Sequence, residues 1–171
     1  PRSASTQAVY DGLMEIIAAE GPVLKERVFH LYVRAAGIGR VARIIRRALE
    51  TGLGRAMRFK EIEVHKENLS PSETEEVLVT ASSVRTVVRT LGTRTLHEVP
   101  LSELAEVIQR FESRGYREED ALFREVLRNY SSVRLTAEVR ARLRAARHLG
   151  RPDYDQPPDE DHEFLQPKLD L

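Results

Sequence analysis

Arginine side chains at helical spacing are the groups in this sequence best suited to bind an anionic ligand. Within residues 40–51 the apolar positions recur at helical intervals and leave Arg43, Arg46 and Arg47 on the opposite side. Guanidinium groups form bidentate hydrogen bonds with phosphate oxygens and with the O6 and N7 atoms of guanine. The pattern therefore predicts a helix that docks onto a nucleic acid, with duplex DNA as the expected partner.

A second set of arginines repeats this arrangement near the C-terminus. Within residues 136–148, Arg140, Arg144 and Arg147 are spaced by four and three residues, so a helix places them in one outer stripe. Further cations lie just before these helices and on the extended segments between them. The full set of candidate nucleic-acid-binding residues is Arg40, Arg43, Arg46, Arg47, Arg58, Lys60, Arg85, Arg89, Arg134, Arg140, Arg144 and Arg147.

The hydrophobic pattern predicts three helices, then strands, then three more helices. The expected helices cover residues 6–19, 24–36, 40–51, 101–111, 117–129 and 136–148. The third is expected to end at Gly52 and to turn Val41, Ile44, Ile45, Ala48 and Leu49 inward. The first expected strand covers residues 57–64. After a loop at 68–72, two more strands are expected at 76–81 and 84–91. Three short helices followed by a β-ribbon is the order of a winged helix, a variant of the helix-turn-helix.

The two helical sets align with each other when the sequence is shifted by 94 residues. Leu13 then meets Val107, Phe29 meets Phe123, and the loops keep the same lengths. We therefore expect a mostly helical α+β fold of tandem winged-helix-like modules with a β-wing between them. The modules are residues 1–95, with the extended wing, and residues 96–150.

Residues 151–171 are expected to be an acidic, disordered tail. Between Pro152 and Leu171 there are seven acidic residues and one Lys, together with four of the eight prolines. Because the formal net charge of the chain is zero, this excess of six acids leaves the preceding residues basic by six. Such a tail can also fold back over the arginine surface and compete with anionic ligands.

A protein-interaction or dimerisation module is the main alternative. Arginine-rich solvent faces are common, Glu50 and Glu138 interrupt the stripes, and winged helices also bind proteins. In that case apolar residues on the strands, such as Val79, Val87 or Val88, are expected to bury against a partner, including a second copy of the chain.

The sequence offers no pattern typical of a catalytic, metal or cofactor site. Its five histidines are scattered, without the spacing of three or four residues that a helical metal site uses. There is no cysteine and no P-loop pattern, and Gly37-Ile38-Gly39 lacks the third glycine of a dinucleotide site. No apolar run approaches the length of a membrane span. We expect a cytoplasmic, non-catalytic chain without cofactors, and the first residue, Pro1, indicates a piece of a longer protein.

One short pattern resembles a known family. The stretch Glu20-Gly21-Pro22-Val23, followed by a helix and then by Gly37-Ile38-Gly39-Arg40 and Arg43-Ile44, resembles a bacterial domain of unknown function. That domain lies at the C-terminus of very large helicase-like ATPases with a superfamily-one motor and a nuclease-like module. A His usually follows the Val of this turn in the family, whereas Leu24 stands here, so no role of that His carries over. The resemblance covers roughly residues 1–50.

The resemblance implies a role within a larger enzyme. Its motif is structural, because the Gly and Pro form a tight turn between helices, and it identifies no catalytic residue in this chain. It implies an accessory domain of a DNA-processing or defence-related ATPase, so the rest of that polypeptide is an expected partner.

Overall fold

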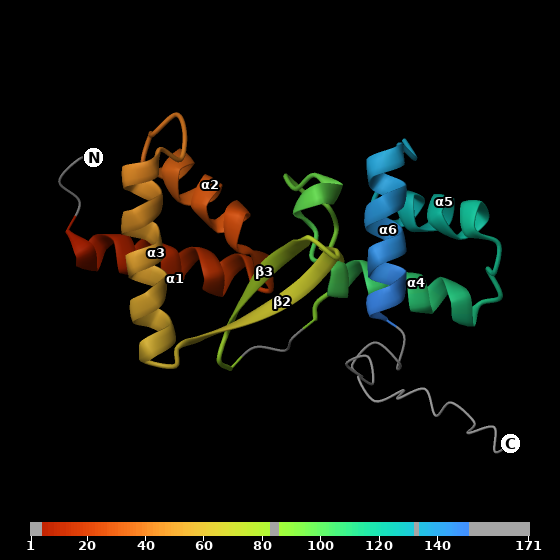
Figure 1. The fold of residues 1–171 in the computed structure, drawn as a ribbon, viewed down its shortest axis with the longest axis horizontal. Coiled ribbons are helices and arrows are strands. Elements are labelled where there is room, and N and C mark those ends of the chain that lie inside the picture. The colour runs from red at the N-terminus through yellow and green to blue at the C-terminus, as the bar shows by residue number, and fades with distance from the viewer. Residues whose placement is uncertain (1–4, 83–85, 132–133, 151–171) are drawn as a thin grey trace, which may run out of the picture.

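The fold is α+β, with the helices in two groups on either side of a small antiparallel sheet (Figure 1). A computed structural model describes residues 5–82, 86–131 and 134–150. The elements in chain order are α1 (Thr6–Glu20), β1 (Val23–Leu24), α2 (Lys25–Ala35), α3 (Arg43–Arg58), β2 (Ile62–Ser70), β3 (Glu73–Thr80), the 3-10 turn η1 (Leu96–Glu98), α4 (Leu101–Ser113), α5 (Glu119–Asn129) and α6 (Ala137–Leu149). In the described ranges, no helix is both long and apolar enough to cross a membrane.

The first helical group begins and ends at residues that the sequence marks. The Ser5 hydroxyl accepts a hydrogen bond from the Ala8 amide over 3.1 Å and so caps α1. The chain after α2 turns at Gly37, whose φ of 69° lies in the left-handed region that favours glycine. The apolar faces of the three helices meet the sheet in one core cluster, made of Val9, Leu13, Ile17, Val23, Val28, Phe29, Val33, Leu49, Leu53, Ala56, Ile62 and Leu78.

α3 is longer than the sequence pattern predicts. It continues through Gly52 to Arg58 and a turn follows, so the expected strand at residues 57–64 is wrong over residues 57–61. Gly52 lies inside the helix because it faces α1: a Cβ atom there would stand 2.8 Å from Leu13 Cδ1 and 3.4 Å from Val9 Cγ1. The glycine therefore allows two helices to approach closely and does not end one. Ile44, expected in the core, is 83% exposed.

The sheet has the order β1-β3-β2 and is antiparallel throughout. β2 and β3 form a long hairpin in which Ile62 pairs with Thr80 and Asn68 with Thr74. The expected loop at 68–72 is thus largely strand, while the expected strand at 76–81 lies within β3 apart from its last residue. The two-residue β1 lies opposite Leu78 and Val77, so Leu24 is a strand residue and not the first residue of the predicted helix. Residues 86–91 are not strand, and 83–85 lie outside the described ranges.

The second helical group matches its predicted segments closely. α4, α5 and α6 begin within two residues of the expected starts, and the Thr136 hydroxyl caps α6 by accepting from the Val139 amide over 3.3 Å. This group buries its own core cluster, made of Leu96, Val99, Leu101, Leu104, Val107, Ile108, Leu122, Phe123, Val126, Leu127, Tyr130, Val139, Leu143 and Ala146. Two separate cores therefore support the two groups.

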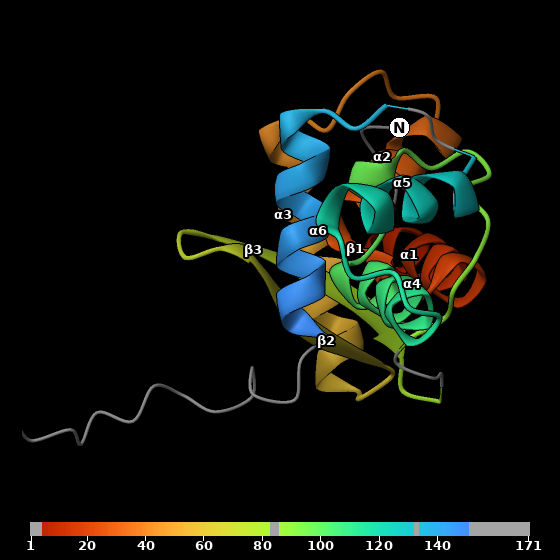
Figure 2. The ribbon, with the colours of Figure 1, turned by 90° about the vertical axis from the view of Figure 1, so that its right-hand side faces the viewer.

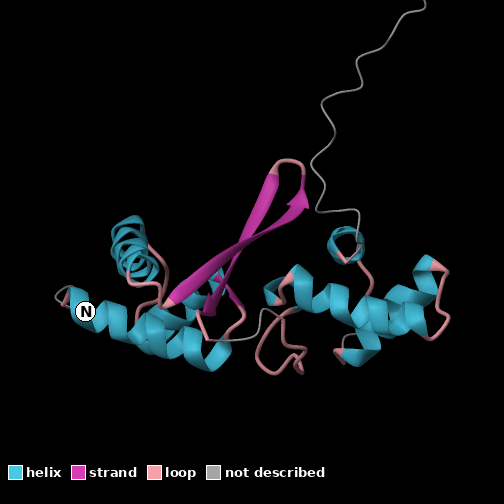
Figure 3. Ribbon diagram, turned by 90° about the horizontal axis from the view of Figure 1, so that it is seen from below, coloured by secondary structure: helices cyan, strands magenta, loops and turns pink. Residues whose placement is uncertain are grey.

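α3 and α6 lie on the same face of the molecule. Both run in the same direction in Figure 1, with α1 and α4 crossing behind them. Figure 2, turned by 90°, shows the β2–β3 hairpin projecting beyond both helices. Figure 3 shows α3 and α6 nearly end on, with the hairpin between them. The fold thus presents two helices and one hairpin toward the same side.

Candidate nucleic-acid interface

The outer face of α3 carries arginines that have no partner among the described residues. Arg43, Arg47 and Arg58 are exposed, and the spacing between them places them along one side of the helix together with the exposed Thr51 and Gly54. Within the described ranges, none of these three guanidinium groups has an ion pair or hydrogen bond. We call Arg43, Arg47 and Arg58, with the residues between them on that side, the outer face of α3.

Other cations extend this face at both ends of the helix. Arg40 precedes α3 in the turn after Gly37, where it lines a groove of about 640 Å³ together with Arg34 and His30. Lys60 follows α3 at a positive φ of 58°. Both side chains are exposed and, among the described residues, unpaired. Arg58 and Lys60 therefore lie at the end of α3 and in the turn after it, not on a strand as expected.

Arg46 has a structural role, because it is bound to a carboxylate of α2. Its two terminal nitrogens donate to the two Glu26 carboxylate oxygens over 2.6 and 2.7 Å, and its guanidinium lies 5.4 Å from the centre of the Phe29 ring. These hydrogen bonds lower the pKa of Glu26 below its usual value. The side chain thus ties α3 to α2, and it is not available to a phosphate without breaking that contact.

The arginines of α6 are also engaged. Arg144 Nη2 donates to Glu119 over 2.6 Å, Arg140 pairs with Glu119 and Asp120, and Arg147 Nη2 lies 2.6 Å from Glu112. Hydrogen bonds from Arg144 and Arg140 lower the pKa values of Glu119 and Asp120, respectively. The expected basic stripe on α6 is therefore neutralised by carboxylates from α4 and α5, which removes these three residues from the candidate interface.

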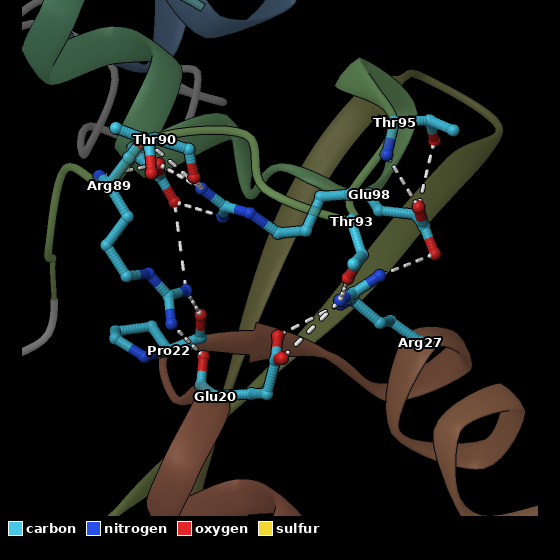
Figure 4. Close-up of polar contacts among 10 residues, drawn as sticks. Glu20, Pro22, Arg27, Arg89, Thr90, Thr93, Thr95 and Glu98 are labelled. Atoms are coloured by element: carbon cyan, nitrogen blue, oxygen red, sulfur yellow. Dashed lines mark hydrogen bonds and ion pairs between the residues drawn. The ribbon is translucent and has the colours of Figure 1, made fainter.

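The remaining candidates have separate places. Arg89 is half-buried and bonds to the backbone after α1: its Nη2 donates to the Pro22 carbonyl over 2.7 Å, and its Nη1 donates to the Glu20 carbonyl (Figure 4). Arg134 is exposed just before α6, away from the outer face of α3. Arg85 lies outside the described ranges, as does the acidic tail. The structure thus brings together only part of the predicted set.

A polar joint between the two helical groups was missed by the sequence reasoning. Arg27, 4% exposed, donates from Nε to Glu20 over 3.1 Å and from Nη1 to Glu98 over 3.0 Å, and its Nη2 reaches the Thr93 hydroxyl over 3.2 Å (Figure 4). One guanidinium therefore connects the end of α1 to the segment that leads into α4.

Glu103 is the buried centre of this joint. The carboxylate is 2% exposed and accepts from Arg94 Nη1 over 2.7 Å and from Arg94 Nη2 over 2.9 Å. It also accepts from the Arg89 amide over 3.0 Å and from the Tyr130 hydroxyl over 3.3 Å. Burial raises the pKa of Tyr130, which keeps that hydroxyl protonated and able to donate.

The hairpin is fixed to the second group by two further carboxylates. Glu67 accepts from the Leu101 amide over 2.6 Å and the Ser102 amide over 3.2 Å, so a strand residue caps α4. The Glu75 carboxylate accepts hydrogen bonds from both terminal nitrogens of the buried Arg142, each over 2.8 Å. Burial raises the pKa of Glu67. These contacts hold the hairpin against α4 and α6.

A cleft of about 520 Å³ between α2, the hairpin and η1 is the main alternative place for a small ligand. It is lined by both acids and bases, and its Glu76 and Glu98 carboxylates already bond to Lys25 and Arg27. In the described part of the chain, no group of three or more His, Asp or Glu side chains is placed to hold a metal ion. The arrangement of α3 is therefore the better-defined candidate site.

Comparisons with protein-family models, with curated proteins and with solved structures found no match to this chain.

Proposed function

We propose that this chain binds the phosphate backbone of a nucleic acid duplex through the outer face of α3. The observation that carries the proposal is the contrast between the two exposed helices. Among the residues that the structure describes, Arg43, Arg47 and Arg58 on α3 have no partner, and Arg40 leads into that helix, whereas the α6 arginines are paired with carboxylates. Unpaired guanidinium groups along one helix face are the groups that neutralise phosphates and release their counterions.

The arrangement of the first half supports a winged helix as the scaffold of this interface. The order α1-β1-α2-α3-β2-β3, with the sheet order β1-β3-β2, is that of a winged helix. In helix-turn-helix proteins the second helix of the motif, here α3, enters the major groove. The hairpin tip carries no base between Leu69 and Glu73, so α3 supplies the cationic contacts.

The helix bounds support a duplication. Shifted by 94 residues, Lys25 at the start of α2 falls on Glu119 at the start of α5, and Arg43 at the start of α3 falls on Ala137 at the start of α6. Gly37 falls on Ser131, and both have a positive φ, of 69° and 52°. We propose that residues 96–150 are a second, reduced module in which the arginines took on structural ion pairs.

The chain then acts as a non-catalytic accessory domain. This part of the proposal rests on the resemblance at Glu20–Val23 and Gly37–Arg40, which implies a larger DNA-processing or defence-related ATPase as the parent protein. Few groups on α3 are suited to base edges, so binding is expected to depend weakly on sequence.

Salt dependence of duplex binding tests the proposal. With roughly four phosphate contacts, the logarithm of the association constant is expected to fall with that of the salt concentration with a slope of about −3 to −4. Fluorescence anisotropy of a labelled 16-base-pair DNA duplex, titrated at several salt concentrations, measures this slope. Absence of binding at low salt, or binding that does not weaken as salt increases, contradicts the proposal.

A dimerisation or protein-interaction module remains the second candidate, because Ile44, Met57 and Phe59 are exposed large hydrophobic residues on or next to α3. Two of the residues expected to serve it are covered within the chain: Val79 is 1% exposed, and Val88 packs against the second core. Light scattering after size exclusion, with and without duplex, separates the two. A dimer that persists at high salt and retains no DNA favours this candidate.

A further inference from the structure

The outer face of α3 combines cations with exposed apolar side chains. Arg43, Arg47 and Arg58 have no partner in the part of the chain that the structure describes, and Lys60 extends the face in the turn after the helix. The large hydrophobic residues that are exposed in that part of the chain all lie on α3 or directly after it: Ile44, Met57 and Phe59. Phosphate oxygens neutralise the cations but are no partners for apolar side chains. The face is therefore also suited to a ligand that carries both carboxylates and apolar groups.

The C-terminal segment of this chain has that combination in its sequence. Residues 153–163 contain six acidic residues and no Lys or Arg, and they lie outside the described ranges. Three large aromatic or aliphatic residues stand within this run or directly after it: Tyr154, Phe164 and Leu165. A guanidinium group pairs with a carboxylate in the same bidentate way as with a phosphate. The segment therefore offers partners to both kinds of side chain on the outer face of α3.

The segment is long enough to reach every part of that face. α3 and α6 both contact β2, a strand of nine residues and hence about 30 Å long. α3 has 16 residues and is about 24 Å long. Figure 1 shows the C-terminal ends of α3 and α6 at the same end of the molecule, and the segment follows α6 in the chain. Residues 151–171 span up to about 70 Å when extended, so the contact requires no rearrangement of the fold.

We infer that the acidic segment, residues 153–163, docks on the outer face of α3 and competes there with the nucleic acid. The competition rests on the proposed function, whereas the docking rests on charge, apolar groups and reach. A ligand tethered by a short linker has an effective concentration on the order of millimolar, so weak ion pairs are sufficient to hold it. α6 is a poorer docking place, because its Arg140 and Arg144 are already paired with Glu119.

Zero-length cross-linking of the full chain tests the docking without any nucleic acid. A carbodiimide joins a carboxylate to a lysine amine that is in direct contact with it. Lys60 extends the outer face of α3, whereas the exposed Lys66 of β2 lines the cleft beside α2 and η1 and is the matched control. At low salt, peptide mass spectrometry is expected to find Lys60 joined to residues 153–163 about fivefold more often than Lys66. The Arg43→Ala Arg47→Ala variant is expected to lose this preference.

A mixture of isotope-labelled and unlabelled chains shows whether each cross-link lies within one chain. Equal cross-linking of Lys60 and Lys66 overturns the inference, as does a preference for Lys60 that survives in the Arg43→Ala Arg47→Ala variant. Cross-links that mainly join a labelled to an unlabelled chain also overturn it, because the segment then binds a second copy.

The competition is measured by the anisotropy of a labelled 16-base-pair DNA duplex. The full chain is compared with a variant in which each Asp of residues 153–163 is replaced by Asn and each Glu by Gln. If the segment covers the face in about nine of ten molecules, the variant binds DNA about tenfold more tightly.

The Arg43→Ala Arg47→Ala background distinguishes competition on α3 from general repulsion between the segment and DNA. In that background the gain is expected to fall to about twofold or less, because the segment no longer covers the face. Unchanged affinity in the neutralised chain, or a gain of the same size in both backgrounds, overturns the competition. If no variant binds DNA while Lys60 still cross-links to the segment, the proposed function is wrong and the docking stands.

Discussion

A Glu103→Leu variant is expected to be less stable than the wild type by about 3–5 kcal/mol, because it leaves the buried Arg94 guanidinium without its counter-charge. Arg94 and Glu103 have side chains only 5% and 2% exposed, and they are joined by two hydrogen bonds of 2.7 and 2.9 Å. The Arg89 amide and the Tyr130 hydroxyl also lose their acceptor. Chemical denaturation followed by circular dichroism measures the change in unfolding free energy.

Two further variants separate charge pairing from general damage to α4. Glu106→Leu changes the same helix, but Glu106 is 43% exposed and paired with Arg110 on the surface, so a change within about 0.5 kcal/mol is expected. Adding Arg94→Met to Glu103→Leu removes the unpaired charge and is expected to restore part of the stability. If the losses of stability of Glu103→Leu alone and Arg94→Met alone simply add in the double variant, the two residues are not coupled and the account of the joint is wrong.

Gly52→Val is expected to destabilise the chain by about 1–3 kcal/mol through overpacking between α1 and α3. A Cβ atom at this position would lie 2.8 Å from Leu13 Cδ1, and Leu13 is itself 1% exposed and has little room to move. Valine also adds two methyl groups at a place where α1 and α3 are already in close contact. Thermal unfolding is the direct measurement.

Gly54→Ala provides the matched control on the same helix. Nothing lies within 4 Å of a Cβ atom at Gly54, so alanine is expected to stabilise α3 by about 0.5–1 kcal/mol through its higher helix propensity. Opposite signs for the two glycines confirm that only Gly52 is a packing position. A stable Gly52→Val variant shows that the two helices do not approach as closely as described.

The sequence predicts most helices because each buries one face at regular spacing. The observed first residue lies within two positions of the predicted one for α1, α4, α5 and α6. The caps at Ser5 and Thr136 are local signals that the sequence shows directly. Gly52 misled the prediction because glycine is common where helices end. Whether it ends a helix or admits a neighbouring one depends on Leu13, which is distant in sequence.

The candidate site was predictable only in part, because a free arginine and a paired one look alike along a chain. Arg43 and Arg144 both lie on exposed helices, but Arg144 meets Glu119 from α5, 25 residues earlier. Glu75 and Arg142 are 67 residues apart. Tertiary packing determines which carboxylate pairs with which arginine. Helical spacing therefore predicts which side chains face outward, but not which residues they contact.

The most direct test of the central claim compares two double variants that remove the same charge. Arg43→Ala with Arg47→Ala alters the outer face of α3, and Arg140→Ala with Arg144→Ala alters α6. For a DNA duplex titrated over a range of salt concentrations, the α3 variant is expected to bind at least about tenfold more weakly, with a salt slope reduced in magnitude by about two. The α6 variant is expected to keep the wild-type slope. Equal losses in both variants, or a larger loss in the α6 variant, contradict the claim that α3 alone holds the phosphates.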